Sequence, residues 1–170
     1  MREIKRFVAI LSLLKNAQGT VGKTFIQKGI YILQEGLEED LGYRYKLHFY
    51  GPFSQELATD VDTLHYRGLI NVQYDVNTDG YRIEITELGK KFLKKYQQES
   101  GVDEKNVKKV LSLIDRELTK KMELLGTVLY FAKLTDNESE IKKLVNMFKP
   151  HFSDNEIEEA LERLREEGMV

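Results

Sequence analysis

Cysteine and tryptophan are absent from this chain, and proline is scarce. The 170 residues include no cysteine, no tryptophan and two prolines, Pro52 and Pro150. Without cysteine there is no disulfide, no thiolate nucleophile and no cysteine-ligated metal. A protein that does without disulfides suits the reducing cytoplasm, where we expect it to work.

An excess of charge of one sign is also lacking. The 26 basic residues nearly balance the 28 acidic ones, which leaves a net charge of -2. Whole-chain charge therefore provides no long-range attraction to nucleic acid or to a membrane surface, and binding of that kind would need a local patch. With 41% hydrophobic and 32% charged residues, the composition is typical of a folded, soluble domain.

No hydrophobic run is long enough to suggest a membrane span, and we expect no membrane partner. The run at residues 7–14 superficially looks like the apolar part of a signal peptide. However, Glu3 lies in the basic segment before it, Lys15 ends it, and no cleavage site follows. Apolar residues at helical spacing predict a buried first helix over residues 2–16 instead.

Signatures of catalysis are missing too. The three histidines, His48, His65 and His151, fall in different predicted elements and have no metal-ligand spacing. The chain has no glycine-rich phosphate loop of the required frame and no convincing nucleophile–histidine pairing. We therefore predict a non-enzymatic protein with no cofactor and no metal site.

What the sequence does contain is a series of helices interrupted by strands. A second helix is expected over 23–36, a strand over 43–50, and a third helix that begins after the N-cap Ser54 and ends at Gly68. Residues 69–74 and 80–86 read as two strands that alternate apolar and polar side chains, and the dipeptide Asp79-Gly80 favours a hairpin between them. Three helices followed by a hairpin predict a winged helix-turn-helix lobe over residues 1–98.

The second half has the pattern of helices alone, at about 104–117, 120–134, 137–148 and 154–167. The predicted fold class is thus mainly α with a small β-hairpin (α+β), a winged-helix lobe being followed by a helical lobe over 99–170. Shifting the third helix by 100 residues places its apolar stripe and its Gly-apolar-apolar end on the last helix. The second lobe is either a wingless three-helix repeat of the first or an ordinary set of amphipathic helices.

Two motifs in the first lobe carry a family resemblance. Residues 25–32 read Phe-Ile-Gln-Lys-Gly-Ile-Tyr-Ile, and Tyr-Gly-Pro follows at 50–52. This pairing resembles the Panacea domain, a family of antitoxin-like proteins, over roughly residues 20–70. Two positions depart from the family pattern: Phe53 stands where valine usually follows the proline, and the nearby tryptophan is absent. The resemblance implies a regulatory protein that binds and neutralises a protein partner, such as a toxin, without catalysis.

Residues 50–52 allow two interpretations. Pro52 and Gly51 can simply end a strand and give the third helix a rigid start. Alternatively, the corner is an exposed patch that contacts a partner. In the second case the candidate partner-binding residues are those of the two motifs: Gln27, Lys28, Tyr31, Tyr50, Gly51 and Pro52.

The alternative function is that of a DNA-binding winged-helix transcription regulator, which would form a homodimer through its C-terminal helices. The third helix would then enter the major groove. Its candidate nucleic-acid contacts, with those of the hairpin and the next helix, are Thr59, Thr63, Arg67, Arg82, Lys90 and Lys94. The exposed side of the third helix also carries three carboxylates, which disfavour an approach to phosphates. The sequence therefore favours a protein partner over DNA.

Overall fold

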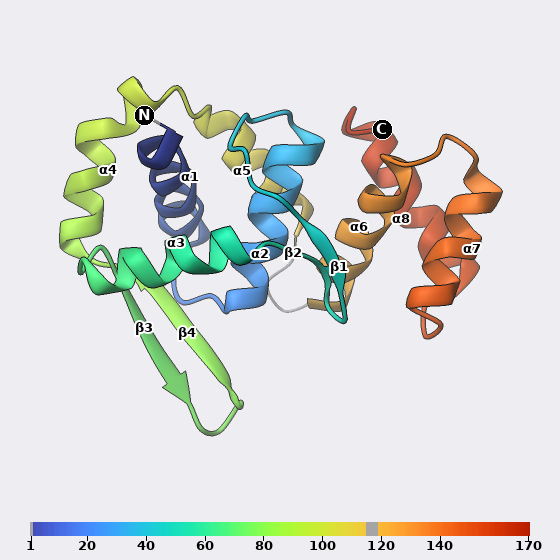
Figure 1. The fold of residues 1–170 in the computed structure, drawn as a ribbon, viewed down its shortest axis with the longest axis horizontal. Helices are drawn as coiled ribbons and strands as arrows, with labels where there is room; N and C mark the ends of the chain where they lie inside the picture. The colour runs from blue at the N-terminus through green and yellow to red at the C-terminus, as the bar shows by residue number, and fades with distance from the viewer. Residues whose placement is uncertain (1, 115–118) are drawn as a thin grey trace.

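A computed structural model describes residues 2–114 and 119–170 of the chain (Figure 1). The structure is mainly helical with two small antiparallel strand pairs, which confirms the α+β class. Its helices are α1 (Arg2–Ala17), α2 (Lys23–Tyr31), the π-helical turn η1 (Ile32–Gly36), α3 (Gln55–Tyr66), α4 (Glu87–Ser100), α5 (Glu104–Leu113), α6 (Thr119–Ala132), α7 (Glu138–Phe148) and α8 (Asp154–Glu166). Its strands are β1 (Lys46–His48), β2 (Gly51–Phe53), β3 (Ile70–Asp75) and β4 (Gly80–Ile85).

Helix α1 forms the centre of the N-terminal half. Every residue from position 7 to position 14 is buried, which confirms the predicted buried helix. Helices α2, α3, α4 and α5 all pack against α1, and Figure 1 shows it enclosed among them. A helix that is apolar on nearly all sides is stable in such a position because each side meets another element.

Helix α3 begins and ends where its local sequence predicts. The Ser54 hydroxyl accepts a hydrogen bond from the amide of Leu57 at the N-terminus. At the C-terminus Gly68 adopts a left-handed conformation with φ of +77°. The amides of Gly68 and Leu69 then donate to the carbonyls of His65 and Leu64, the bonding pattern of a Schellman cap.

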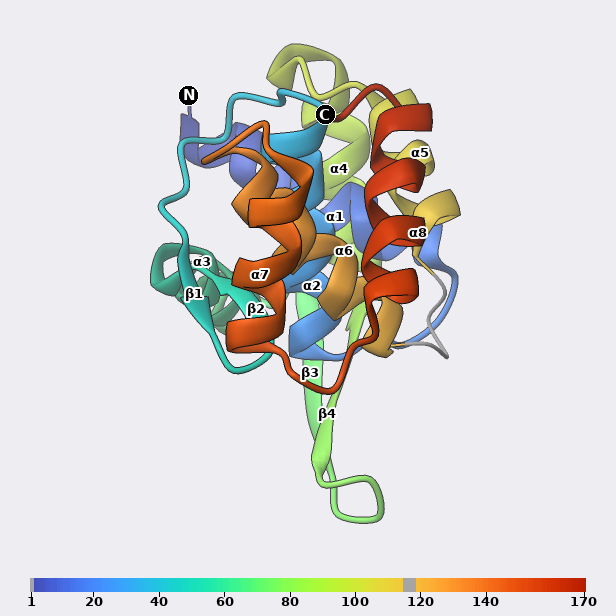
Figure 2. The same cartoon turned by 90° about the vertical axis from the view of Figure 1, so that its right-hand side faces the viewer.

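The β3–β4 hairpin has the predicted alternation. Ile70 pairs with Ile85, Val72 with Ile83, and Tyr74 with Tyr81, so the apolar side chains share one face. Val21, between α1 and α2, adds an antiparallel bridge to Ile83. Figures 1 and 2 show the hairpin projecting away from the helical body. Helices α1 to α3 followed by the β3–β4 hairpin are in the order expected of a winged helix-turn-helix. The assignment of that fold to this lobe stays a prediction.

The strand predicted over residues 43–50 is wrong in its extent. Strand β1 covers Lys46–His48, and the chain then turns back at Phe49 and Tyr50. Gly51 to Phe53, expected to lead directly into helix three, form β2 and pair with β1. The Tyr-Gly-Pro segment therefore covers the end of the turn and the start of the return strand of a short hairpin.

Helices α6, α7 and α8 lie at the end of the molecule opposite α4 (Figure 1). Helix α6 packs against α2, η1 and β2 on one side and against α7 and α8 on the other. The predicted capping box of α8 is present, since Ser153 and Glu156 exchange hydrogen bonds. Its predicted core residues Ile157, Leu161 and Leu164 are buried.

The C-terminal end of α8 repeats the cap of α3. Gly168 has φ of +72°, and the amides of Gly168 and Met169 donate to the carbonyls of Arg165 and Leu164. Met169 is buried and packs beside Gly36. Helix α5, placed by the sequence in the second lobe, packs against α1 and η1. The division at residue 98 and the internal duplication both stay predictions.

Helix α5 ends at Leu113, before the predicted position 117; positions 115–117 of that prediction lie outside the described residues. None of the described helices combines the length and the apolar composition that crossing a membrane requires.

Candidate functional site

Two aromatic side chains stand at the turn of the β1–β2 hairpin. Phe49 is 90% exposed and Tyr50 is 68% exposed, and we call this pair the aromatic tip. Hairpin turns usually carry glycine, asparagine, aspartate or serine, because those residues suit the turn backbone. At such a position large rings stay mostly in contact with water and add little hydrophobic stabilisation. The stability of the fold therefore does not explain why aromatic residues stand at this turn.

Gly51 allows the aromatic tip to form. Phe49 and Tyr50 are not among the residues with positive φ, whereas Gly51 has φ of +97°. A turn of ordinary residues followed by a left-handed glycine is a common way to close a hairpin. A β-carbon at Gly51 would also lie 3.1 Å from Cε of Lys28 and 3.3 Å from Oγ1 of Thr127. Backbone conformation and close packing both require glycine here.

Helix α2 holds the return strand from behind. The Gln27 side chain donates to the Ser54 carbonyl at 2.9 Å and accepts from the Ser54 amide at 2.9 Å. One helical position on, the Lys28 ammonium donates to the Pro52 carbonyl at 2.7 Å. All these groups are buried. Gln27 and Lys28 thus fix β2 and the start of α3 from inside the molecule.

This arrangement corrects the predicted partner surface. Gln27, Lys28, Tyr31, Gly51 and Pro52 are all buried, so they do not form an exposed patch. The reason is that α6 covers β2: Gly126 packs beside Pro52, and Thr127 lies beside Gly51. Of the six predicted partner-binding residues, Tyr50 is exposed. The sequence did not single out its neighbour Phe49 as a contact, although two bulky residues before Gly-Pro were a usable signal.

Three charged side chains are buried together behind β2, and we call Lys28, Glu123 and Lys149 the charge cluster. The Lys149 ammonium lies 2.7 Å from the Glu123 carboxylate. Burial lowers the pKa of Lys28 to about 8; the attraction of Glu123 opposes this effect and the repulsion of Lys149 adds to it. Nothing in the sequence linked the three residues, because they belong to segments far apart in the chain.

Tyrosines line the adjoining part of the core. The rings of Tyr31 and Tyr45 meet edge to face with centroids 4.7 Å apart, and Tyr43 lies beside Tyr45. Burial raises the pKa of all three phenols, so they stay protonated at neutral pH. The hydroxyl of Tyr45 is buried and has no hydrogen-bond partner among the described residues.

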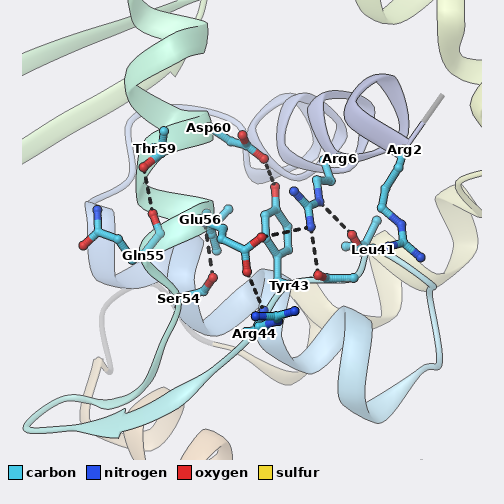
Figure 3. Close-up of polar contacts among 12 residues, drawn as sticks. Arg2, Arg6, Leu41, Tyr43, Arg44, Ser54, Gln55, Glu56, Thr59 and Asp60 are labelled. Carbon is cyan, nitrogen blue, oxygen red and sulfur yellow. Dashed lines mark hydrogen bonds and ion pairs between the residues drawn. The ribbon is translucent and has the colours of Figure 1, made fainter.

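The segment that leads into β1 is fixed by the contacts in Figure 3. Arg6 donates to the carbonyls of Leu41 and Gly42 at 2.7 and 2.8 Å. Its guanidinium stacks over the Tyr43 ring, and the Tyr43 hydroxyl donates to Asp60 of α3 at 2.6 Å. Desolvation raises the pKa of Asp60 despite the hydrogen bond from Tyr43. The hairpin that carries the aromatic tip is therefore anchored to α1, α2 and α3.

Most of the predicted nucleic-acid contacts already have partners within the fold. Thr59 and Thr63 donate their hydroxyls to carbonyls of their own helix. Arg67, Arg82 and Lys90 each lie beside a carboxylate, at 3.5, 3.8 and 3.1 Å respectively. Lys94 belongs to α4 and Arg82 to β4, and Figures 1 and 2 show α4 and the β3–β4 hairpin extending in opposite directions.

The described residues contain no group of three or more acidic or histidine side chains placed to hold a metal ion. A cavity of about 1020 Å³ lies among α5, α6 and α8. Leu124 and Leu125 of α6 line it together with Glu156, Glu159 and Arg163 of α8.

No family model matches this chain. It is similar to a protein of Bacillus subtilis (strain 168) named "Uncharacterized protein YwgA", with 26% identity over 166 residues that cover 96% of each chain. The similarity extends over both halves of the chain, but the name of that relative attributes no activity to it.

Proposed function

We propose that this chain is a non-enzymatic regulatory protein whose aromatic tip binds a protein partner. The carrying observation is that Phe49 and Tyr50 are both large aromatic residues and are exposed together at the turn of the β1–β2 hairpin. Aromatic residues are enriched among the residues that contribute most to protein–protein binding, because one ring buries much area at a small cost in side-chain entropy.

Rigidity of the support favours the same function. The Gln27 and Lys28 hydrogen bonds hold the return strand, and Gly51 closes the turn against Thr127. A tip that is fixed before binding loses little conformational entropy when a partner covers it. The resemblance to the Panacea domain adds that the partner is a toxin or a related protein, with the chain acting as its antitoxin.

The DNA-binding alternative is favoured by the element order and by the Val21–Ile83 bridge. Charge opposes it. Glu56 and Asp62 are exposed on α3, and the nearby Arg67 already lies beside Glu3. Attraction between basic side chains and the DNA phosphates supplies much of the affinity of DNA-binding proteins. On α3, contacts with phosphates would have to overcome the repulsion from these carboxylates.

Affinity capture with matched variants tests the proposal. The wild-type chain, a Phe49→Ser/Tyr50→Ser variant and a Tyr66→Ser control are immobilised and exposed to lysate of the source organism. Tyr66 is 93% exposed on α3, so its replacement removes an equally accessible ring elsewhere. We expect a protein that the wild type and the control retain and the tip variant loses. Equal retention by all three, or no specific retention by the wild type, would contradict the proposal.

A further inference from the structure

The charge cluster lies at the contact between two parts of the molecule. Lys28 belongs to α2, Glu123 belongs to α6, and Lys149 directly follows α7. Their exposed fractions are 2%, 9% and 4%, respectively. Strand β2 supplies to this cluster only backbone, the carbonyl of Pro52.

Two ammonium groups share one carboxylate in this cluster. Lys149 makes the close contact with Glu123, while the hydrogen bond of Lys28 goes to a neutral carbonyl. A buried charge is tolerated when a partner of opposite charge offsets its lost hydration. One positive charge is therefore left without full compensation where β2 meets α6.

Opening this contact would relieve that cost. Gly126 and Thr127 of α6 pack beside Pro52 and Gly51, with the Lys28 side chain next to both pairs. If α6 moved away from β2, water would reach the Lys28 ammonium. The apolar contacts of α6 with α2, η1 and β2 oppose the movement. Folded proteins open locally with free energies that depend on how strongly such contacts hold a segment closed.

We propose that the charge cluster makes this contact an opening point, at which α6, α7 and α8 separate from β2 and hydrate Lys28. In the open state the aromatic tip loses the support of α6 behind Gly51 and Pro52. That consequence for partner binding rests on the proposed function, whereas the opening itself does not.

The pH dependence of opening follows from proton binding. Lys28 has a pKa of about 8 in the closed state and regains the ordinary 10.5 once hydrated. The open state then binds more protons between these values, so opening becomes less favourable as pH rises through this window. Among the described charged groups, Glu123 on α6 and Lys149 after α7 act on Lys28. The closed-state pKa of about 8 already contains the effects of both groups.

Hydrogen exchange of the α6 amides measures the opening in the full chain without a partner. After correction for intrinsic exchange rates, we expect the opening equilibrium to fall about tenfold between about pH 7 and about pH 9. Amides of α1 should exchange more slowly, because they need global unfolding. A Lys28→Met variant should lose this pH dependence, and a Lys94→Met control should retain it.

Equal protection of α6 and α1 together with a pH-independent opening would overturn the proposal. A second measurement covers the case in which Lys28→Met fails to fold. Titration of the Lys28 side chain by carbon NMR in the wild type should give a midpoint near 8. In a Lys149→Met variant the midpoint should rise, because the repelling ammonium is gone. A Lys28 titration midpoint near the ordinary 10.5 in the wild type would refute the claim that this buried charge lacks full compensation.

Discussion

At the scale of single residues, the Gln-Lys pair of α2 and the Gly-Pro pair of β2 act together. The side chains of Gln27 and Lys28 hydrogen-bond to the backbone of Ser54 and Pro52. Gly51 leaves room for Lys28 and Thr127. The two motifs that carry the family resemblance therefore contact each other inside the fold, and what they support is the exposed pair beside them.

Replacing Gly51 with alanine tests that support. We expect the free energy of unfolding to fall by roughly 2–4 kcal/mol, because the β-carbon adds a close contact to the cost of a positive φ. Gly101→Ala is the matched control: Gly101 has φ of +75° and nothing within 4 Å of the added carbon. It should lose about 1 kcal/mol. Equal losses in urea denaturation would show that packing at Gly51 does not matter.

Single-residue signals also set the limit of sequence prediction at this site. The sequence identified Tyr50, Gly51 and Pro52 as a special corner, because glycine and proline restrict the backbone in known ways. It misplaced Gln27, Lys28 and Tyr31 on the surface. Helix α2 is covered by β2 and α6, and no local pattern in α2 indicates which distant elements will cover it.

At the scale of elements, the helix ends and the β3–β4 hairpin were predictable. The helix ends are set by capping residues that act on backbone groups a few residues away, namely Ser54, Gly68 and Ser153. The local sequence is therefore enough to predict where these helices begin or end. The β1–β2 hairpin and the π-helical turn η1 were missed. The first depends on pairing that Gln27 and Lys28 stabilise from α2. In the second, Gly36 packs beside Met169 from the far end of the chain.

The apolar face of α3 gives an element-scale prediction. Leu64 is fully buried, so Leu64→Ala should lower the free energy of unfolding by about 2–5 kcal/mol through lost contacts and a residual cavity. Thr59→Ala, on the exposed side of the same helix, should change it by about 0.5 kcal/mol or less. Chemical denaturation of both variants checks the assignment, and a loss at Leu64 no larger than at Thr59 would refute it.

At the scale of the whole molecule, charge distinguishes the two functions. The net charge is -2, and Arg67, Arg82 and Lys90 each lie beside a carboxylate, which disfavours binding to phosphates. A winged-helix architecture alone does not determine function.

We therefore expect no gel shift of duplex DNA at micromolar protein and about 50 mM salt, where phosphate-driven binding is strongest. A shift that a Lys90→Ala/Lys94→Ala variant abolishes would instead support the DNA-binding alternative.

The affinity of the aromatic tip for a purified partner tests the central proposal most directly. Calorimetric titration of the captured protein should give a dissociation constant that rises about thirtyfold or more in the Phe49→Ser/Tyr50→Ser variant, the loss of about 2 kcal/mol typical of dominant aromatic contacts. The Tyr66→Ser control should bind like the wild type. Unchanged affinity in a folded tip variant would contradict a binding role for Phe49 and Tyr50.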